Sequence, residues 1–204
     1  MAERVGDTWQ RLPLLDADVR YAQAWLDHDE ADALFAHLWD EIPWEQHRLR
    51  IFGRDVDAPR LSCWIGDPHA TYAYSRTRFE PRPWTPSLHS LRGRLERACG
   101  ARFNSVLANL YRGGQDSMGW HSDDEPELGS QPVIASLSLG AERRFRFRRR
   151  APRGKRVDSV GLPLSHGSLL CMAGDTQRHY QHDVPKSSSV TGMRINLTFR
   201  LIRP

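Results

Sequence analysis

His121 and Asp123, separated by Ser122 in the stretch NLYRGGQDSMGWHSDDE (109–125), are the residue types that most directly suggest chemistry. On an extended strand, residues i and i+2 point to the same face, so an imidazole and a carboxylate at this spacing can hold one metal ion together. Two protein ligands do not complete such a site. The alternative is an ordinary strand with a buried, hydrogen-bonded histidine beside a surface aspartate, and a third ligand elsewhere would decide between the two interpretations.

Three histidines that follow in the sequence are candidates for the third ligand. His166 lies in PLSHGSLLCM, where a turn or capping role is the simpler interpretation. His179 and His182 lie three apart in HYQH and would point to opposite faces of an extended segment, so at most one of them can bind the same ion. Spacing leaves both open. Two imidazoles and one carboxylate with open positions would form the facial triad of non-haem Fe(II) oxygenases.

The terminal segment RINLTFRLI carries a second chemical signal, because its residues alternate between polar and apolar. If the polar face is exposed, its arginines are simply solvated. If that face lines the interior of a barrel, a buried guanidinium needs an anionic partner, and a dicarboxylate co-substrate would be one. The polar face holds Arg194, Asn196, Thr198 and Arg200, and the apolar face holds Ile195, Leu197, Phe199 and Leu201.

A β-rich domain with two helices must position these residues. The amphipathic segments EADALFAHLWDEI and SLHSLRGRLERACG predict helices that end at Pro43 and Gly100. Residues 1–25 show no strong period, and we expect them to cover the surface of the domain. An antiparallel sandwich or small barrel is the natural closure for the strand-like runs. These runs are LRIF, PRLSCWIGD, ATYAYS, NSVLANLY, PVIASLSLG, RRFRFRR, VDSVGLPL, GSLLCMAG and RINLTFRLI.

Composition is typical of one globular domain without a membrane segment. The chain has 204 residues, 26% of them charged and 39% hydrophobic, and no apolar run approaches the roughly 20 residues that span a bilayer. Its first residues lack the pattern of a signal peptide, and its three cysteines suit reduced thiols, so we expect a cytoplasmic monomer. The net charge of +4 is compatible with a polyanionic partner.

Several separated motifs together resemble the AlkB family of Fe(II)- and 2-oxoglutarate-dependent nucleic acid dioxygenases. They are NLY, HSDDE, HGSLLCM, HYQHDVP and RINLTFR, with PRLSCWIGD, TYAYS and PVIASLSLG, and they occur in the family's order. The match covers roughly residues 50–204 and is most similar to the human-type homologues that demethylate DNA and RNA. It implies an α+β, mainly β fold, a double-stranded β-helix (jelly roll) with flanking N-terminal helices. The single domain, 1–204, would comprise an N-terminal extension with a helix (1–45), a nucleotide-recognition region (46–102) and the catalytic core (103–204).

The resemblance also implies ligands for iron and 2-oxoglutarate. His121 and Asp123 match the family's first two metal ligands. An HxVP-like context, twelve residues before the first arginine of the terminal strand, selects His182 over His179. The family's co-substrate residues match four positions here: Asn109 and Tyr111, which would hydrogen-bond 2-oxoglutarate; Arg200, which would hold its distal carboxylate; and Arg194, which would lie beside its 1-carboxylate and the iron-bound aspartate.

The implied reaction is oxidative demethylation of N-alkylated bases, such as 1-methyladenine and 3-methylcytosine, in DNA and also in RNA, with O2 consumed and formaldehyde released. A flipped-out base would stack between His121 and Tyr74, with Tyr72 and Glu125 near its edge. Phe52, before Gly53 at a predicted hairpin tip, would fill the gap in the duplex; a core phenylalanine is the alternative. Rival functions are an oxygenase of the same fold acting on a protein or small molecule, and a catalytically silent nucleic-acid-binding module.

A basic segment, ERRFRFRRRAPRGKR (142–156), interleaves arginines with two phenylalanines. The simpler interpretation is a solvated hairpin with Phe145 and Phe147 packed inward. We favour phosphate contact for the arginines, because so many like charges on one hairpin repel each other unless a polyanion neutralises them.

Overall fold

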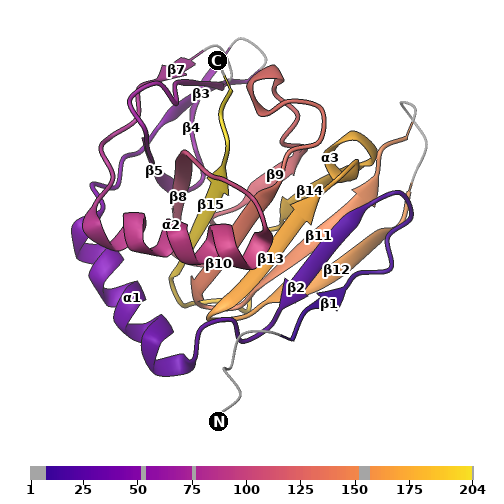
Figure 1. Cartoon of the computed structure of the whole chain (residues 1–204), viewed down its shortest axis with the longest axis horizontal. Coiled ribbons are helices and arrows are strands. Elements are labelled where there is room, and N and C mark those ends of the chain that lie inside the picture. The colour runs from indigo at the N-terminus through magenta and orange to yellow at the C-terminus, as the bar shows by residue number, and fades with distance from the viewer. Residues whose placement is uncertain (1–7, 52–53, 75–76, 152–156, 204) are drawn as a thin grey trace.

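The strands form two antiparallel sheets that face each other, as the computed structural model shows (Figure 1). The structure describes residues 8–51, 54–74, 77–151 and 157–203, and for 49–51, 54–55, 72–74 and 77–79 it describes the backbone alone. Two antiparallel sheets that face each other, with helices beside them, form the predicted jelly roll. No helix of the described residues is long and apolar enough to cross a membrane.

The major sheet has seven strands in the order β1-β2-β13-β10-β15-β8-β5. In this order β15 lies between β10 and β8, and all of its residues are buried. The terminal segment therefore sits near the middle of the major sheet. The strands are Gln10–Arg11 (β1), Asp18–Ala22 (β2), Leu61–Gly66 (β5), Ser105–Tyr111 (β8), Ile134–Gly140 (β10), Ser168–Ala173 (β13) and Arg194–Arg200 (β15).

The minor sheet has four strands in the order β12-β11-β14-β9. Two further antiparallel pairs, β3 with β4 and β6 with β7, lie outside both sheets. The minor-sheet strands are Met118–His121 (β9), Arg143–Arg149 (β11), Ser159–Leu164 (β12) and Tyr180–Val184 (β14), and the paired strands are Arg48–Ile51 (β3), Arg54–Asp57 (β4), Tyr72–Tyr74 (β6) and Thr77–Phe79 (β7).

Two long helices cover the outer face of the major sheet (Figure 1). The helix α1 (His28–Glu41) begins where the side chain of Asp27 accepts a hydrogen bond from the Glu30 N–H, and Pro43 follows its end. The helix α2 (Pro86–Cys99) has proline in its first turn and ends at Gly100, whose φ of 67° is the left-handed conformation that glycine adopts readily. Two short elements complete the chain, the 3-10 helix η1 (Pro126–Leu128) and α3 (Thr176–His179).

Apolar side chains pack on both faces of the major sheet. One cluster joins α1 and α2 to the sheet and includes Leu38, Leu95 and Leu197, each 0% exposed. Burial of each such leucine contributes about 1.5–3 kcal/mol. A second cluster, with Phe147 and Met172, fills part of the space between the sheets. The alternation of β15 follows from this arrangement, because its apolar face meets the helices and its polar face meets the minor sheet.

The prediction that residues 1–25 only cover the surface was wrong for Asp18–Ala22. These residues form β2, which pairs with β13 and buries Val19 and Tyr21 between the sheets. An alternation over five residues is too short to distinguish a strand from a loop in the sequence alone. The major sheet thus takes β1, β2 and β5 from outside the catalytic core predicted for residues 103–204.

Candidate active site

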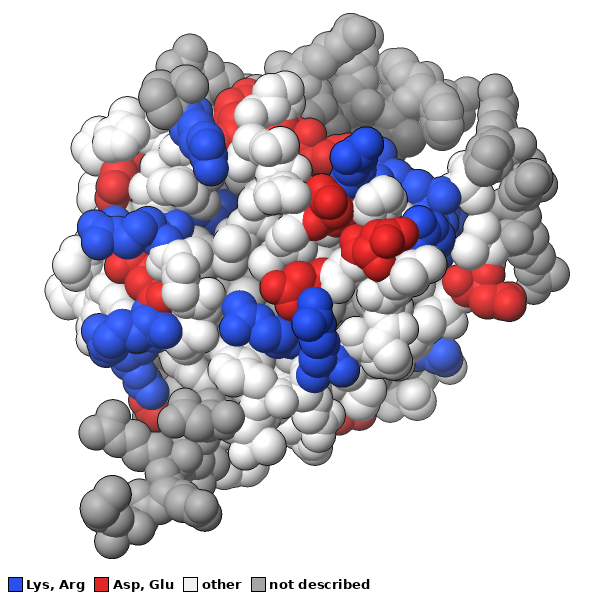
Figure 2. Space-filling view, turned by 45° about the vertical axis from the view of Figure 1, so that its right-hand side comes forward, with Lys and Arg blue, Asp and Glu red and all other residues white. Residues whose placement is uncertain are grey.

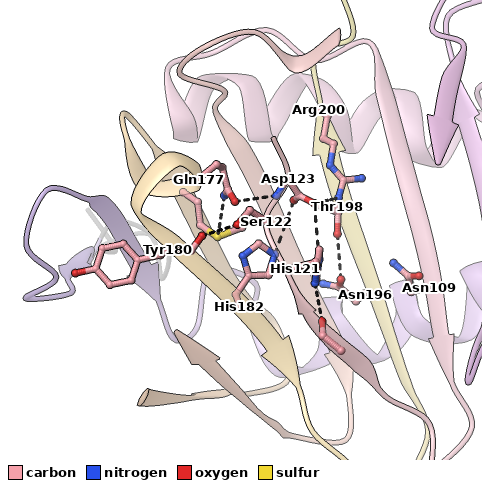
Figure 3. Close-up of polar contacts among 12 residues, drawn as sticks. Asn109, His121, Ser122, Asp123, Gln177, Tyr180, His182, Asn196, Thr198 and Arg200 are labelled. Carbon is pink, nitrogen blue, oxygen red and sulfur yellow. Dashed lines mark hydrogen bonds and ion pairs between the residues drawn. The ribbon is translucent and has the colours of Figure 1, made fainter. Parts of the chain in front are cut away.

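One cavity between the two sheets brings together all seven residues that were predicted for the metal and the co-substrate. The cavity is lined from β8, β9, β14 and β15, so strands far apart in the sequence converge on it. Figure 3 shows several of these side chains pointing toward one another. The seven are Asn109, Tyr111, His121, Asp123, His182, Arg194 and Arg200, and Ser136, Asn196 and Thr198 lie among them.

His121, Asp123 and His182 converge on one point. His121 is the last residue of β9 and pairs with His182 on β14, while Asp123 lies two residues beyond the end of β9. The Nε2 atoms of His121 and His182 lie 3.8 and 4.0 Å from the carboxylate oxygens of Asp123, and the ligand atoms lie within 4.8 Å of one another. His179 ends α3 instead of continuing an extended segment. The structure therefore groups His182 with the pair.

The protonation states of the three residues suit a metal ion. The Nδ1 atom of His121 lies 2.8 Å from the carbonyl oxygen of Gly119, so Nδ1 donates and the lone pair of Nε2 faces Asp123. Burial lowers the pKa of His182 to about 3. Burial would raise the pKa of Asp123, but the Arg200 guanidinium and the two neighbouring imidazoles together outweigh it, and the pKa falls to about 2. At neutral pH the residues are a carboxylate and a neutral imidazole, the forms that bind a metal.

A second group of histidine and aspartate side chains, His28, Asp32 and His166, does not suit a metal. The backbone N–H of Gly140 donates to Nδ1 of His166 at 2.7 Å, so the proton of the neutral ring lies on Nε2. That Nε2 faces Asp32 at 3.2 Å and has no lone pair to offer an ion. The turn role predicted for His166 agrees with this contact.

Arg194 offers an uncompensated positive charge to the cavity. Its side chain is 1% exposed, and its Nη2 donates to Ser138 Oγ at 2.9 Å. Its guanidinium lies over the ring of Tyr111, 5.1 Å from the centroid. Among the described residues, the Nε and Nη1 atoms have no hydrogen-bond partner and no carboxylate pairs with the group. A buried guanidinium in this state fits an anionic ligand.

The structure contradicts one part of the roles predicted for the two arginines. The resemblance placed Arg194 beside the metal-binding aspartate, whereas it is Arg200 whose Nη2 donates to Oδ1 of Asp123 at 3.0 Å. The two residues lie at opposite ends of β15, and Arg194 instead adjoins Tyr111. Motif order could not reveal this, because both arginines occupy the polar face of the same strand.

Asn109 is held by a residue that the sequence analysis did not single out. Arg60, 7% exposed, donates from Nε to the Asn109 side-chain oxygen at 2.8 Å. Because this oxygen is occupied, Nδ2 is the atom that Asn109 can present to a ligand. Asn196, on the predicted polar face of β15, donates to Ser136 Oγ at 2.8 Å and fixes the floor of the cavity. Arg60 lies in the motif PRLSCWIGD, but nothing in that motif indicated its contact, which depends on the pairing of β5 with β8.

The residues predicted to bind the base are described less fully. Phe52 lies outside the described residues, between the paired strands β3 and β4. Tyr72 and Tyr74 lie on β6, where the backbone alone is described. Glu125 is half-buried at the start of η1 and is not among the described residues that line the cavity. Their roles stay predictions.

The basic hairpin is neutralised more fully than the sequence suggested. Phe145 and Phe147 pack inward as predicted. Arg146 donates to Asp183 at 2.9 Å and Arg149 to Asp16 at 2.7 Å. Arg150 pairs with Asp124, and the buried Arg143 donates to three backbone carbonyls. Figure 2 shows basic and acidic residues side by side on this face. The repulsion that favoured phosphate contact is therefore partly relieved within the protein, and 152–156 lie outside the described residues.

Comparisons with known proteins agree with the geometry. The chain is 44% identical to human alpha-ketoglutarate-dependent dioxygenase alkB homolog 3, covering 88% of this chain and 64% of that protein. It is 45% identical to the rat homologue, covering 88% and 62%. The chain thus spans less than two thirds of these relatives.

A further relative and a solved structure match this chain over a larger share of their own length. The chain is 39% identical to the human DNA oxidative demethylase ALKBH2, covering 97% of this chain and 78% of that protein. The solved structure of OsALKBH1 matches with a TM-score of 0.63 at 17% identity, over 95% of this chain and 99% of that one, which supports the fold. The sequence profile of the 2OG-Fe(II) oxygenase superfamily matches residues 18–200, so the match begins earlier than residue 50, where we expected it. The chain belongs to the AlkB family within the 2OG-Fe(II) oxygenase superfamily.

Proposed function

We propose that this protein is an Fe(II)- and 2-oxoglutarate-dependent dioxygenase that demethylates N-alkylated bases, such as 1-methyladenine and 3-methylcytosine, in DNA and also in RNA. The observation that carries the proposal is the convergence of His121, Asp123 and His182 in the same cavity as the uncompensated Arg194. Relatives named as a DNA oxidative demethylase supply the substrate class. We place the activity in the cytoplasm, or in the nucleus of a eukaryotic cell, and expect a monomer.

Three side chains of this chain would hold Fe(II), and four would hold 2-oxoglutarate. The metal ligands would be His121, Asp123 and His182, of which Asp123 is a carboxylate and His182 a neutral imidazole at neutral pH. Bound iron would supply the oxidising power, with O2 and 2-oxoglutarate giving succinate, CO2 and a hydroxylated N-methyl group. The hydroxymethyl group then leaves the base as formaldehyde without further help from the protein.

The contacts of the two arginines support a different set of co-substrate roles from the one that the resemblance implied. Arg194 would pair with the distal carboxylate, because its Nε and Nη1 have no hydrogen-bond partner among the described residues. Tyr111, whose ring lies beneath Arg194, and Asn109, through Nδ2, would donate further hydrogen bonds. Arg200 would hold Asp123 in place and lie beside the 1-carboxylate. Removal of water from this enclosed space strengthens each of these charged contacts.

The base would enter beside His121, whose side chain is 22% exposed while those of Asp123 and His182 are 4% exposed. A base in a duplex must be flipped out to reach this position. Tyr74 would stack on its other face, with Tyr72 and Glu125 at its edge, and stacking of one base contributes about 1–3 kcal/mol. Because 1-methyladenine and 3-methylcytosine are cationic, the Glu125 carboxylate would favour them over normal bases. Phe52 would fill the gap in the duplex.

The test is formaldehyde release from matched single- and double-stranded oligonucleotides that carry 1-methyladenine or 3-methylcytosine. We expect release that requires Fe(II), 2-oxoglutarate and the methyl group. Glu125→Ala should lower the preference for the cationic base, and Phe52→Ala should reduce activity on duplex more than on single strands. Succinate formation that is indifferent to every methylated oligonucleotide would instead support an oxygenase with a protein or small-molecule substrate.

A further inference from the structure

We propose that Gln177 is a positioning residue that fixes the metal ligand Asp123. Gln177 lies on the short helix α3 and is 2% exposed. Its side-chain oxygen accepts a hydrogen bond from the backbone N–H of Asp123 at 3.0 Å, as Figure 3 shows. Its Nε2 lies 3.6 Å from the sulfur of Met172. The inference rests on the proposed metal site and adds a residue that neither binds the ion nor touches the substrate.

The hydrogen bond from Asp123 to Gln177 satisfies a backbone N–H for which the sheet provides no acceptor. The strand β9 ends at His121, so the backbone of Asp123, 3% exposed, lies beyond the ladder with β14. A buried N–H without an acceptor costs about 1–3 kcal/mol. The oxygen of Gln177 satisfies this N–H while leaving the backbone of Asp123 outside strand geometry. The carboxylate can then face Arg200 and both histidines at once.

A neighbouring contact attaches the loop that carries Asp123, the ligand loop, to the segment that contains Gln177. Ser122 donates from Oγ to the carbonyl oxygen of Tyr180 at 2.7 Å and accepts from Arg150 Nε at 3.2 Å. Two consecutive residues of the ligand loop are thus attached to positions 177 and 180, just before His182. This segment therefore sets the position of Asp123 relative to His182, and a shift of the loop would break both contacts.

Substitution of residues that orient metal ligands commonly weakens metal binding by about 10–100-fold. Gln177→Met removes the acceptor and keeps the side-chain length, so we expect a weakening of this size for Mn(II). If Gln177→Met does not fold, Gln177→Asn gives the same comparison, because its shorter side chain does not reach Asp123.

The matched control is Thr176→Val in the same helix. Thr176 is 1% exposed and bonds to Ala173 and Asp18, with no contact to the ligand loop given by the described residues. The readouts are the dissociation constant of Mn(II), the absorbance of the anaerobic protein with Fe(II) and 2-oxoglutarate, and the unfolding temperature without metal. Thr176→Val should lower only the unfolding temperature.

Two results would overturn the inference. One is unchanged Mn(II) affinity and absorbance in Gln177→Met, and the other is an equal loss in Thr176→Val, which would reduce the role of Gln177 to the stability of α3. In both cases the unsubstituted protein still binds Mn(II), so the proposed function survives. Failure of the unsubstituted protein to bind Mn(II) or Fe(II) would instead overturn the metal site and the inference together.

Discussion

Arg200 and Asp123 form a buried ion pair, in which Nη2 donates to Oδ1 at 3.0 Å and both side chains are nearly enclosed. The guanidinium satisfies one oxygen of a carboxylate that also faces two imidazoles. Arg194, six residues away on the same face of β15, has no such partner. The two arginines therefore differ in what they need: Arg200 already has its anion within the protein, whereas Arg194 needs one from solution.

Arg194→Met should weaken 2-oxoglutarate binding specifically through the distal carboxylate. Loss of one partner of a buried charge pair costs about 2–5 kcal/mol, a factor of ~30 or more in affinity. The measurement is calorimetric binding of 2-oxoglutarate and of 2-oxopentanoate, which lacks that carboxylate, to Mn(II)-loaded protein. The variant should no longer distinguish the two acids. Retained discrimination, or its loss in Arg200→Met instead, would return the distal carboxylate to Arg200.

The same pair of substitutions should change the stability of the metal-free protein in opposite directions. Arg194→Met removes an unpaired buried charge and should stabilise the protein, whereas Arg200→Met leaves Asp123 without its cation and should cost about 3 kcal/mol. Urea unfolding at pH 7 measures both, and Mn(II) should restore part of the loss in Arg200→Met. Destabilisation of similar size by both substitutions would show that Arg194 has an internal partner.

Acidification should destabilise the metal-free protein through His182. The pKa of this residue is about 3 in the folded protein against 6.5 for the free side chain, so between these values the unfolded chain binds the extra proton. Stability therefore falls as the pH drops, by at most about 1.4 kcal/mol per pH unit and about 2 kcal/mol from pH 6.5 to 5. Asp123 adds nothing in this window, because its pKa lies lower in both states. Urea unfolding should show a flatter profile in His182→Gln; identical profiles would contradict the buried, neutral imidazole.

On the basic hairpin, exposed arginines and arginines that pair with a carboxylate should contribute differently to nucleic acid binding. Arg144 is exposed and lies over Gly161, whereas Arg149 is held by Asp16. Arg144→Gln should reduce the dependence of log Kd on log salt by about 1, as expected for one lost phosphate contact, and Arg149→Gln should reduce it less. Fluorescence anisotropy of a labelled oligonucleotide between about 50 and 200 mM salt measures the slope. Slopes equal to that of the unsubstituted protein in both variants would exclude phosphate contact by this strand.

The sequence best predicted the features that recur with the period of a strand or a helix. The alternation of β15 separated a polar face from an apolar one, except that Leu201, placed on the apolar face, lies beyond the strand and is 36% exposed. The stop residues Pro43 and Gly100 marked the ends of α1 and α2 closely. Prediction was weaker where a role depends on neighbours distant in the sequence. Spacing left His179 and His182 equivalent until α3 was seen to end at His179. Both arginines of β15 looked alike, because only the fold places one of them beside Asp123.

Some site residues carry no local pattern that indicates their contacts. Arg60 precedes β5, and Gln177 lies in a four-residue helix, yet each makes a buried hydrogen bond to a residue of the cavity. A single polar residue in such a segment looks like surface in the sequence. Likewise, the acidic partners of the basic hairpin, Asp16 and Asp183, come from the N-terminal loop and β14, so counting charges along the hairpin overestimated its repulsion.

The most direct test of the account is a stoichiometry measured by mass spectrometry on an oligonucleotide that carries a single 1-methyladenine. With Fe(II), 2-oxoglutarate and O2, we predict one succinate and one formaldehyde for each methyl group lost, and no succinate, formaldehyde or demethylated base in Asp123→Ala. Its control, Thr176→Val, should retain the reaction, because Thr176 lies outside the cavity. Succinate formation with the methylated base left intact, or demethylation that persists in Asp123→Ala, would contradict the assignment of this cavity as a demethylase site.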